Sequence, residues 1–207
     1  MHLQSISTTT IPGYRVQEYL LVISPPDVLR DKIREVKKAF SEAYRAETAL
    51  AGRPHITLAN FLQYEMLEER LIGRLQAVAM GYHPFKVELR DFGSFPSHTI
   101  FINVASKLPV QNLVKTIRAE AQRLMKLNDD NKPHFILEPY LAIARKLQPW
   151  QYEKGWLAYR QKHFTGRFIA DAMLLLKRPA GEQGYQVVRR FDFLNLPVLT
   201  KQGLLFG

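Results

Sequence analysis

The chain has 207 residues, of which 46% are hydrophobic, so it is long enough and apolar enough to bury a sizeable core rather than stay disordered. It contains no cysteine, which excludes disulfides and thiolate metal sites and suits a reducing cytoplasm. Its formal net charge of +10 favours polyanionic ligands such as phosphates, a property that many basic proteins share.

The first residues have neither a basic region nor a sustained apolar core, so they do not resemble a signal peptide. We expect residues 1–12 to form a flexible arm. The longest apolar runs, such as residues 19–23 and 172–176, are too short to cross a bilayer. The sequence therefore predicts a cytoplasmic protein with no membrane contact.

Hydrophobic periodicity predicts alternating strands and helices in the first half of the chain. A buried strand over residues 19–23 leads into Ser24-Pro25-Pro26-Asp27, where Ser24 is the expected N-cap of a helix. That helix carries apolar residues at spacings of three and four: Leu29, Ile33, Val36, Phe40 and Tyr44. A strand over 54–61, a helix over 66–80 and two antiparallel strands over 85–95 and 99–104 follow.

The second half repeats this rhythm. One helix is marked by apolar residues at helical spacing: Val110, Leu113, Ile117, Ala121 and Leu124. A strand over 140–145, a helix over 150–163 and strands over 170–176 and 185–193 come after it. Since no flexible linker separates the halves, we expect a single domain over residues 1–207 with two similar lobes.

Two short segments also match each other residue by residue. They are Arg53-Pro54-His55-Ile56-Thr57-Leu58-Ala59-Asn60 and Glu138-Pro139-Tyr140-Leu141-Ala142-Ile143-Ala144-Arg145. Proline, two apolar positions and an alanine coincide, and a helix precedes each segment. We interpret the match as an internal repeat of one structural unit, with chance similarity as the alternative.

His55 and Thr57 form the polar face of the first segment. Residues two apart on a strand point to the same side, so these two side chains lie together while Ile56 points to the core. An imidazole can move a proton near neutral pH, and a hydroxyl can donate a hydrogen bond to a phosphate oxygen. The pair therefore indicates phosphoester chemistry.

Pro54-His55-Ile56-Thr57-Leu58 resembles the signature of the two-histidine phosphoesterase superfamily, which includes 2′-5′ RNA ligase-like proteins and 2′,3′-cyclic phosphodiesterases. This resemblance implies an α+β fold in which two pseudo-symmetric lobes of antiparallel sheet, with flanking helices, surround a central cleft. Each lobe of such a protein contributes one His-x-Thr/Ser strand. His55 is then the expected proton-transfer residue, and Thr57 the phosphate-binding hydroxyl.

The second segment departs from the family pattern at both chemical positions. Tyr140 stands where the family has histidine, and Ala142 stands where it has a hydroxyl residue. A phenol is a reluctant acid, and an alanine side chain donates no hydrogen bond, so the resemblance implies weakened catalysis. Whether His98 or Lys146 fills the gap stays open at this point.

The leading interpretation is a slow, metal-independent hydrolase or transferase acting on a 2′,3′-cyclic or 2′,5′-linked ribonucleotide phosphodiester, without a cofactor. Arg53, Tyr140, Arg145 and Lys146 are the candidate substrate-binding residues beside His55 and Thr57. The alternative is a non-catalytic relative that binds RNA or a nucleotide, and a third possibility is a protein-interaction domain without a phosphate ligand. We expect a monomer whose partner is RNA or a nucleotide phosphate.

Overall fold

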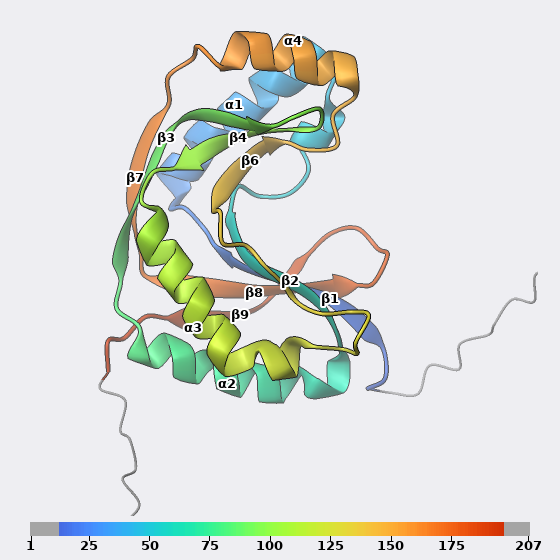
Figure 1. The fold of residues 1–207 in the computed structure, drawn as a ribbon, viewed down its shortest axis with the longest axis vertical. Helices are drawn as coiled ribbons and strands as arrows, with labels where there is room; N and C mark the ends of the chain where they lie inside the picture. The colour runs from blue at the N-terminus through green and yellow to red at the C-terminus, as the bar shows by residue number, and fades with distance from the viewer. Residues whose placement is uncertain (1–12, 197–207) are drawn as a thin grey trace, which may run out of the picture.

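The computed structural model describes residues 13–196, and the expected arm over residues 1–12 lies outside them. Four α-helices and nine strands make up this part of the chain (Figure 1). Their bounds, with two short 3-10 helices, are β1 Val16–Ile23, α1 Asp27–Tyr44, η1 Glu47–Ala49, β2 Ile56–Tyr64, η2 Glu65–Leu67, α2 Glu68–Gly81, β3 Phe85–Phe95, β4 Thr99–Val104, α3 Lys107–Met125, β5 His134–Phe135, β6 Tyr140–Ala144, α4 Pro149–Tyr159, β7 Thr165–Ala170, β8 Ala172–Pro179 and β9 Gln186–Asp192.

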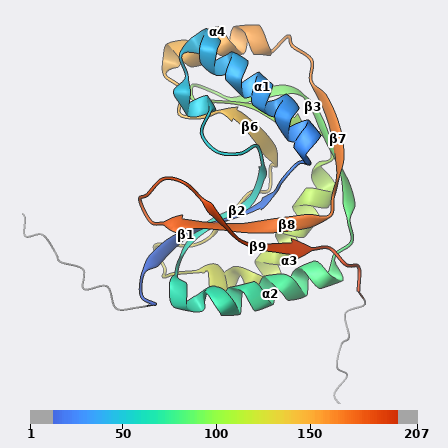
Figure 2. The same cartoon turned by 180° about the vertical axis from the view of Figure 1, so that it is seen from behind.

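All strand pairings are antiparallel, and eight strands follow the order β7-β3-β4-β6-β2-β1-β8-β9, with β5 paired to β2 off this path. The sheet bends at its centre, between β6 and β2, so that its two four-stranded halves face each other across the open side (Figures 1 and 2). This arrangement confirms the predicted α+β class and its antiparallel sheet.

Helices cover the outer face of each half of the sheet. In the figures α2 and α3 lie under the half formed by β2, β1, β8 and β9, while α1 and α4 cover the half formed by β6, β4, β3 and β7. The apolar stripes of the helices and the inward-facing strand residues form one continuous core. Burying that surface is the main stabilising contribution to the fold.

Strands from both halves of the chain are interleaved in each lobe. β3 and β4 come from the first half but join β6 and β7, whereas β8 and β9 come from the second half but join β1. Each lobe therefore closes only when both halves of the chain are in place.

The bulges in the sheet support the predicted internal repeat. In the β1–β2 pairing Leu58 is an extra residue without a partner, and in the β4–β6 pairing Ile143 is the extra residue. These two residues occupy equivalent places in the two matching segments. Because a bulge changes the local twist of a strand, the shared position shows that both segments bend alike beside the centre of the sheet.

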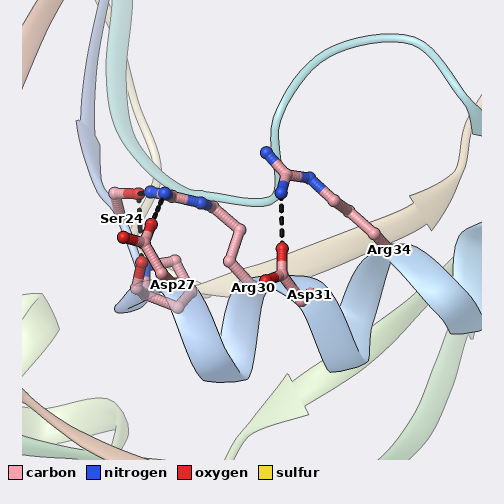
Figure 3. Close-up of polar contacts among 6 residues, drawn as sticks. Ser24, Asp27, Arg30, Asp31 and Arg34 are labelled. Atoms are coloured by element: carbon pink, nitrogen blue, oxygen red, sulfur yellow. Dashed lines mark hydrogen bonds and ion pairs between the residues drawn. The ribbon is translucent and has the colours of Figure 1, made fainter.

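The start of α1 differs from the expectation. Pro26 is the N-cap residue and no side chain caps the helix. The Ser24 hydroxyl instead donates a hydrogen bond to the carbonyl of Pro25 and accepts one from Arg30. The Arg30 guanidinium also pairs with Asp27, which lies in the first turn of the helix (Figure 3).

Two strands were absent from the sequence-based prediction. β5 is only two residues long. β7 (Thr165–Ala170) fills the segment between the strand expected from residue 170 and the helix that we expected to continue to residue 163, which ends at Tyr159. The burial of β7 alternates, with Phe168 and Ala170 inside, but three of its residues are polar or glycine. No helix within residues 13–196 has the length and apolar character needed to span a bilayer.

Candidate functional site

β2 and β6 meet at the centre of the sheet through one antiparallel pair, Ile56 opposite Leu141. Both side chains are fully buried. Since side chains alternate along a strand, the residues on either side of this pair point to the opposite face, away from the helices. His55 and Thr57 therefore share the inner face of the bent sheet, as predicted.

The same alternation places Tyr140 and Ala142, which flank Leu141, on that inner face across from the first pair. The Tyr140 ring packs edge-on against Phe95, with 5.0 Å between ring centres, and against Phe101 at 5.1 Å. Arg145 lies over the same ring, its guanidinium carbon 5.6 Å from the centre. Tyr140 is thus held in an aromatic cluster on one side of the candidate site.

Gly93 makes this aromatic cluster possible. It pairs with Phe101 across β3 and β4. A Cβ atom at position 93 would lie 2.5 Å from Phe101 Cε2 and 2.6 Å from the side-chain oxygen of Asn103. Only glycine lets those two side chains cross β3 and keep the Phe101 ring against Tyr140.

The His55 ring is fixed by its own backbone turn. Its Nδ1 lies 2.7 Å from the carbonyl oxygen of Arg53. A carbonyl oxygen can only accept, so Nδ1 donates the proton and the neutral ring presents an unprotonated Nε2. Arg53 is itself exposed, and its backbone rather than its guanidinium makes this contact.

Burial lowers the pKa of His55 to about 4. The hydrogen bond to Arg53 acts in the opposite direction, and the positive charges of Arg145 and Lys37 lower the pKa further. The physical cause is that a charged imidazolium loses its hydration here without gaining a carboxylate partner. His55 is therefore neutral at physiological pH and able to accept a proton.

Both polar atoms of the motif lack a partner within the protein. Among residues 13–196, four buried side-chain nitrogen or oxygen atoms have no hydrogen-bond partner, and two of them are His55 Nε2 and Thr57 Oγ1. Thr57 is only 6% exposed. An unpaired buried polar atom costs about 1–3 kcal/mol, so two such atoms on one face of one strand point to a ligand that the site is built to receive.

Lys37 is a site residue that the sequence prediction missed. It is buried on α1, and its Nζ donates to the carbonyls of Ala51 and Gly52, each at 3.1 Å. Gly52 has the left-handed φ of +71° that the turn needs. Burial, with Arg145 and Arg34 nearby, lowers the pKa of Lys37 to about 8. This lysine ties down the loop that leads into Arg53 and His55.

A signal for Lys37 was present in the sequence. It lies four residues after Ile33 and three before Phe40, so it falls on the apolar stripe of the helix. A charged residue at a stripe position is rarely buried unless its charge or its hydrogen bonds serve a purpose. The prediction listed the apolar members of the stripe and passed over the cation among them.

Arg145 and Lys146 follow β6 and are both exposed. The backbone of Arg145 is anchored, because its carbonyl accepts from the Thr48 hydroxyl at 2.9 Å. Its positive charge acts on His55, so the two residues lie in one electrostatic environment. Lys146 has a left-handed φ of 53° and no side-chain hydrogen bond or ion pair to any residue between 13 and 196.

His98 lies in the turn between β3 and β4. Its Nδ1 is 2.6 Å from the Thr99 hydroxyl, and its carbonyl accepts from the backbone of Leu147. Its ring centre is 6.3 Å from that of Phe95. Within residues 13–196, His98 makes no hydrogen bond to Tyr140 or His55, although its ring lies beside Phe95, which packs on Tyr140.

The loop between β8 and β9 carries Tyr185, whose hydroxyl is held in a network with Glu18 and Arg178. Tyr185 donates a 2.6 Å hydrogen bond to Glu18, which also binds Arg178 at 2.6 Å, and the Arg178 guanidinium lies 4.5 Å from the centre of the Tyr185 ring. Burial, then the bond to Glu18, raises the pKa of Tyr185, while the charges of Arg178 and Arg145 lower it. Arg145 thus faces both this hairpin and His55.

Among the described residues, no group of three or more histidine, aspartate or glutamate side chains is close enough to hold a metal ion. His55 stands alone with cations around it. The arrangement provides a neutral base, a hydroxyl donor and positive charge on one face of the sheet, which is the equipment for holding and polarising a phosphoester.

The chain is an α+β protein with two pseudo-symmetric halves of one antiparallel sheet, and a His-x-Thr sequence lies where the two halves meet. A model of the 2′-5′ RNA ligase superfamily matches residues 25–182, so the chain belongs to that family. No curated protein sequence matches it significantly.

Solved structures with the same fold agree with this assignment. E. coli LigT complexed with 3′-AMP is 18% identical, with a TM-score of 0.60, and the match covers 86% of this chain and 98% of LigT. A crystal structure of a phosphoesterase is 16% identical, with a TM-score of 0.57 and the same coverage. TT0787 of Thermus thermophilus is 18% identical, with a TM-score of 0.55, again with 86% and 98% covered. LigT has also been crystallised with ATP and with NADP+.

Proposed function

We propose that this protein binds a ribonucleotide phosphate at His55 and Thr57 and cleaves or transesterifies a 2′,3′-cyclic or 2′,5′-linked phosphodiester without a metal ion. The observation that carries the proposal is the pair of buried, unpartnered atoms at the start of β2, His55 Nε2 directly before the strand and Thr57 Oγ1 within it. The family's crystallised relative LigT with 3′-AMP, ATP and NADP+ supports a nucleotide as the ligand.

In this proposal His55 is the general base. Its Nε2 takes the proton of the attacking water or hydroxyl, while Thr57 Oγ1 donates a hydrogen bond to a non-bridging phosphate oxygen. Arg53, Arg145 and Lys146 supply positive charge around the phosphate. A bound phosphate anion also stabilises the imidazolium that forms, so the proton is easier to accept with substrate present than in the empty protein.

The step that lacks a residue is protonation of the leaving oxygen. We place Tyr140 and Ala142 where the family carries its second His-x-Thr, so solvent has to supply that proton and one phosphate contact is missing. Loss of a positioned acid costs about 10²–10⁴-fold, and loss of one oxyanion donor costs roughly 10²–10³-fold. The expected enzyme is therefore slow.

A second candidate function is nucleotide or RNA binding without turnover. It is favoured by the packing of Tyr140 against Phe95 and Phe101, which makes position 140 part of an aromatic wall rather than a free acid. Such a wall suits an unstacked base. Both candidates require a phosphate at His55 and Thr57, and they differ only in turnover.

The test is hydrolysis of a short RNA that ends in a 2′,3′-cyclic phosphate, with EDTA present, by wild type, His55→Ala and Thr57→Val. The matched control is His83→Ala, because His83 is an exposed histidine outside the site. We expect slow turnover in wild type and the control, and loss of at least about 100-fold in both site variants. Equal activity of wild type and His55→Ala would refute the proposed role of His55.

Binding separates the two candidates. If wild type shows no turnover but binds the RNA in a manner that needs His55 and Thr57, the non-catalytic function stands and the hydrolase is rejected for this substrate. If neither turnover nor His55-dependent binding is found with cyclic-phosphate, 2′,5′-linked or mononucleotide ligands, the whole proposal fails and the interaction-domain interpretation replaces it.

A further inference from the structure

A second basic region lies on the helical face of the protein, away from His55. It is a hollow of about 440 Å³ beside α3 and the segment that leads into β5. Four cations and two apolar residues line it: Arg118, Arg123, Lys126, Lys132, Pro133 and Phe135. No carboxylate is among the lining residues. We call this region the α3 hollow.

Most of the positive charge in the α3 hollow is unbalanced. Lys126 pairs with Asp129. Arg118, Arg123 and Lys132 form no ion pair with any residue between 13 and 196. Cations gathered in a concavity produce a focused positive potential, because the low-dielectric wall weakens screening on one side. Solvated surface cations are usually spread over a protein, so four of them lining one hollow favour an anionic ligand there.

The positive surface continues from α3 onto α2. A neighbouring hollow of about 850 Å³ shares Gln122 and Arg123 with the first and adds Arg70 and Arg74 from α2. Its single carboxylate, Glu120, lies 3.5 Å from Arg74. Residues of α2 and α3 line the larger hollow, and residues of α3 and of the segment before β5 line the smaller one. A linear polyanion can therefore contact cations of both helices, although Glu120 partly offsets the charge of the second hollow.

The apolar residues of the α3 hollow indicate which polyanion fits. Phe135, which is half-buried, and Pro133 line the same hollow as the three cations that have no ion pair. A single-stranded nucleic acid offers phosphates to the cations and an unpaired base to the Phe135 ring, whereas the bases of a duplex are already stacked inside it. An acidic peptide uses the charge but leaves the ring without a stacking partner.

We propose that the α3 hollow and its continuation onto α2 bind the phosphate backbone of single-stranded RNA, with Phe135 as a stacking face, separately from the His55 site. β5 anchors the hollow to the motif strand, since Phe135 pairs with Ala59 two residues beyond Thr57. The hollow lies on the helical side of the sheet and His55 on the opposite face, so RNA bound at this surface does not need the His55 site. A mononucleotide is too short to gain from this surface.

The experiment measures fluorescence anisotropy of a 15-nucleotide oligouridylate between about 50 and 200 mM salt. The test variant is Arg118→Gln/Arg123→Gln/Lys132→Gln, in which all three side chains are exposed. Each phosphate contact contributes about −0.7 to the slope of log K against log salt for a single strand, so the triple variant should have a slope smaller by about 2. Over this salt range, wild-type affinity should fall roughly 20-fold more than that of the variant.

The matched control is Lys38→Gln/Lys154→Gln/Arg160→Gln. It removes the same charge from exposed positions on α1, on α4 and at the C-cap of α4; these two helices cover the other lobe. We expect the control to keep the wild-type slope and affinity within about twofold, because distant exposed charges are screened at these salt concentrations. Equal loss in the control and the test variant would show a general charge effect and overturn the proposed site.

Two further arms keep this proposal distinct from the function assigned to His55. His55→Gln should retain oligouridylate binding at the hollow, and the triple variant should cleave or bind a cyclic mononucleotide as wild type does. Phe135→Leu should weaken oligouridylate binding severalfold without changing the salt slope, since stacking is worth about 1–3 kcal/mol per base. An unchanged slope in the triple variant, or tighter binding of a polyglutamate peptide than of the oligouridylate, would refute RNA as the partner.

Discussion

The protonation of His55 is the sharpest expectation that the structure provides. Burial places its pKa at about 4 instead of the ordinary value near 6.5. At about pH 5 the residue should then be roughly 10% charged, whereas an ordinary histidine is roughly 97% charged. The difference in charged fraction is close to tenfold in a range where the carboxylates of the protein are still mostly ionised.

The measurement is a ¹H–¹³C NMR titration of the histidine Cε1–Hε1 signals between about pH 3.5 and 8, with the His55 signal assigned by its loss in His55→Gln. A midpoint near 4 is expected in the protein without ligand. A midpoint above about 6 would contradict the buried imidazole without an acidic partner on which the proposed site depends. The result does not require turnover, so it also tests the site if the protein proves to be non-catalytic.

The same titration tests the cause of the shift. Arg145→Gln removes one of the charges that lower the pKa of His55, so its midpoint should rise, whereas Lys38→Gln on the outer face of α1 should leave it unchanged. Between about pH 4 and 6.5 the unfolded chain holds a proton on His55 that the folded chain lacks. The stability of wild type relative to His55→Gln should therefore rise with pH across that window, by up to about 3 kcal/mol.

Three other expectations follow from the site. Tyr140→His/Ala142→Thr should raise turnover of a cyclic phosphate by about 10²-fold or more, measured as kcat, and no gain would refute the assignment of the missing acid. Gly93→Ala should lower the free energy of unfolding in urea by about 1–3 kcal/mol, because its methyl group meets the Phe101 ring, and unchanged stability would show that the ring moves freely. Between about pH 8 and 10, the stability of wild type relative to Lys37→Met should rise by about 1.4 kcal/mol per pH unit, since the folded lysine has lost the proton that the unfolded one keeps. A flat difference would show that Lys37 is solvated.

Features that follow from a local sequence pattern could be predicted from the sequence. Alternation around Ile56 predicted that His55 and Thr57 share a face, and the match of the two segments predicted equivalent strands at the centre of the sheet. The α+β class followed from the order of the elements and from the resemblance. All of these depend on residues close together in the chain, where period and spacing carry the information.

Other features arise from contacts between distant segments and could not be predicted from spacing. β7 is a strand because β3 pairs with it along its length, although its own residues include Thr165, Gly166 and Arg167. The place of Lys37 on the apolar stripe was visible in the sequence, but its hydrogen bonds to the loop at Ala51 and Gly52, and the low pKa of His55, depend on groups that approach from separate elements. Ser24 had the right spacing for a cap, but Arg30 competes for its hydroxyl.

The interleaved pairing of the lobes sets the order in which the molecule can be assembled. β1 leaves the ribosome well before β8, yet one of its edges pairs with that strand. Until β8 arrives, that edge of β1 is an open hydrogen-bonding template exposed to other nascent chains. Such long-range closure is slow, because the loop entropy is lost before the contacts form. Two fragments divided between β4 and α3 should each be incomplete alone and regain the native sheet only by association.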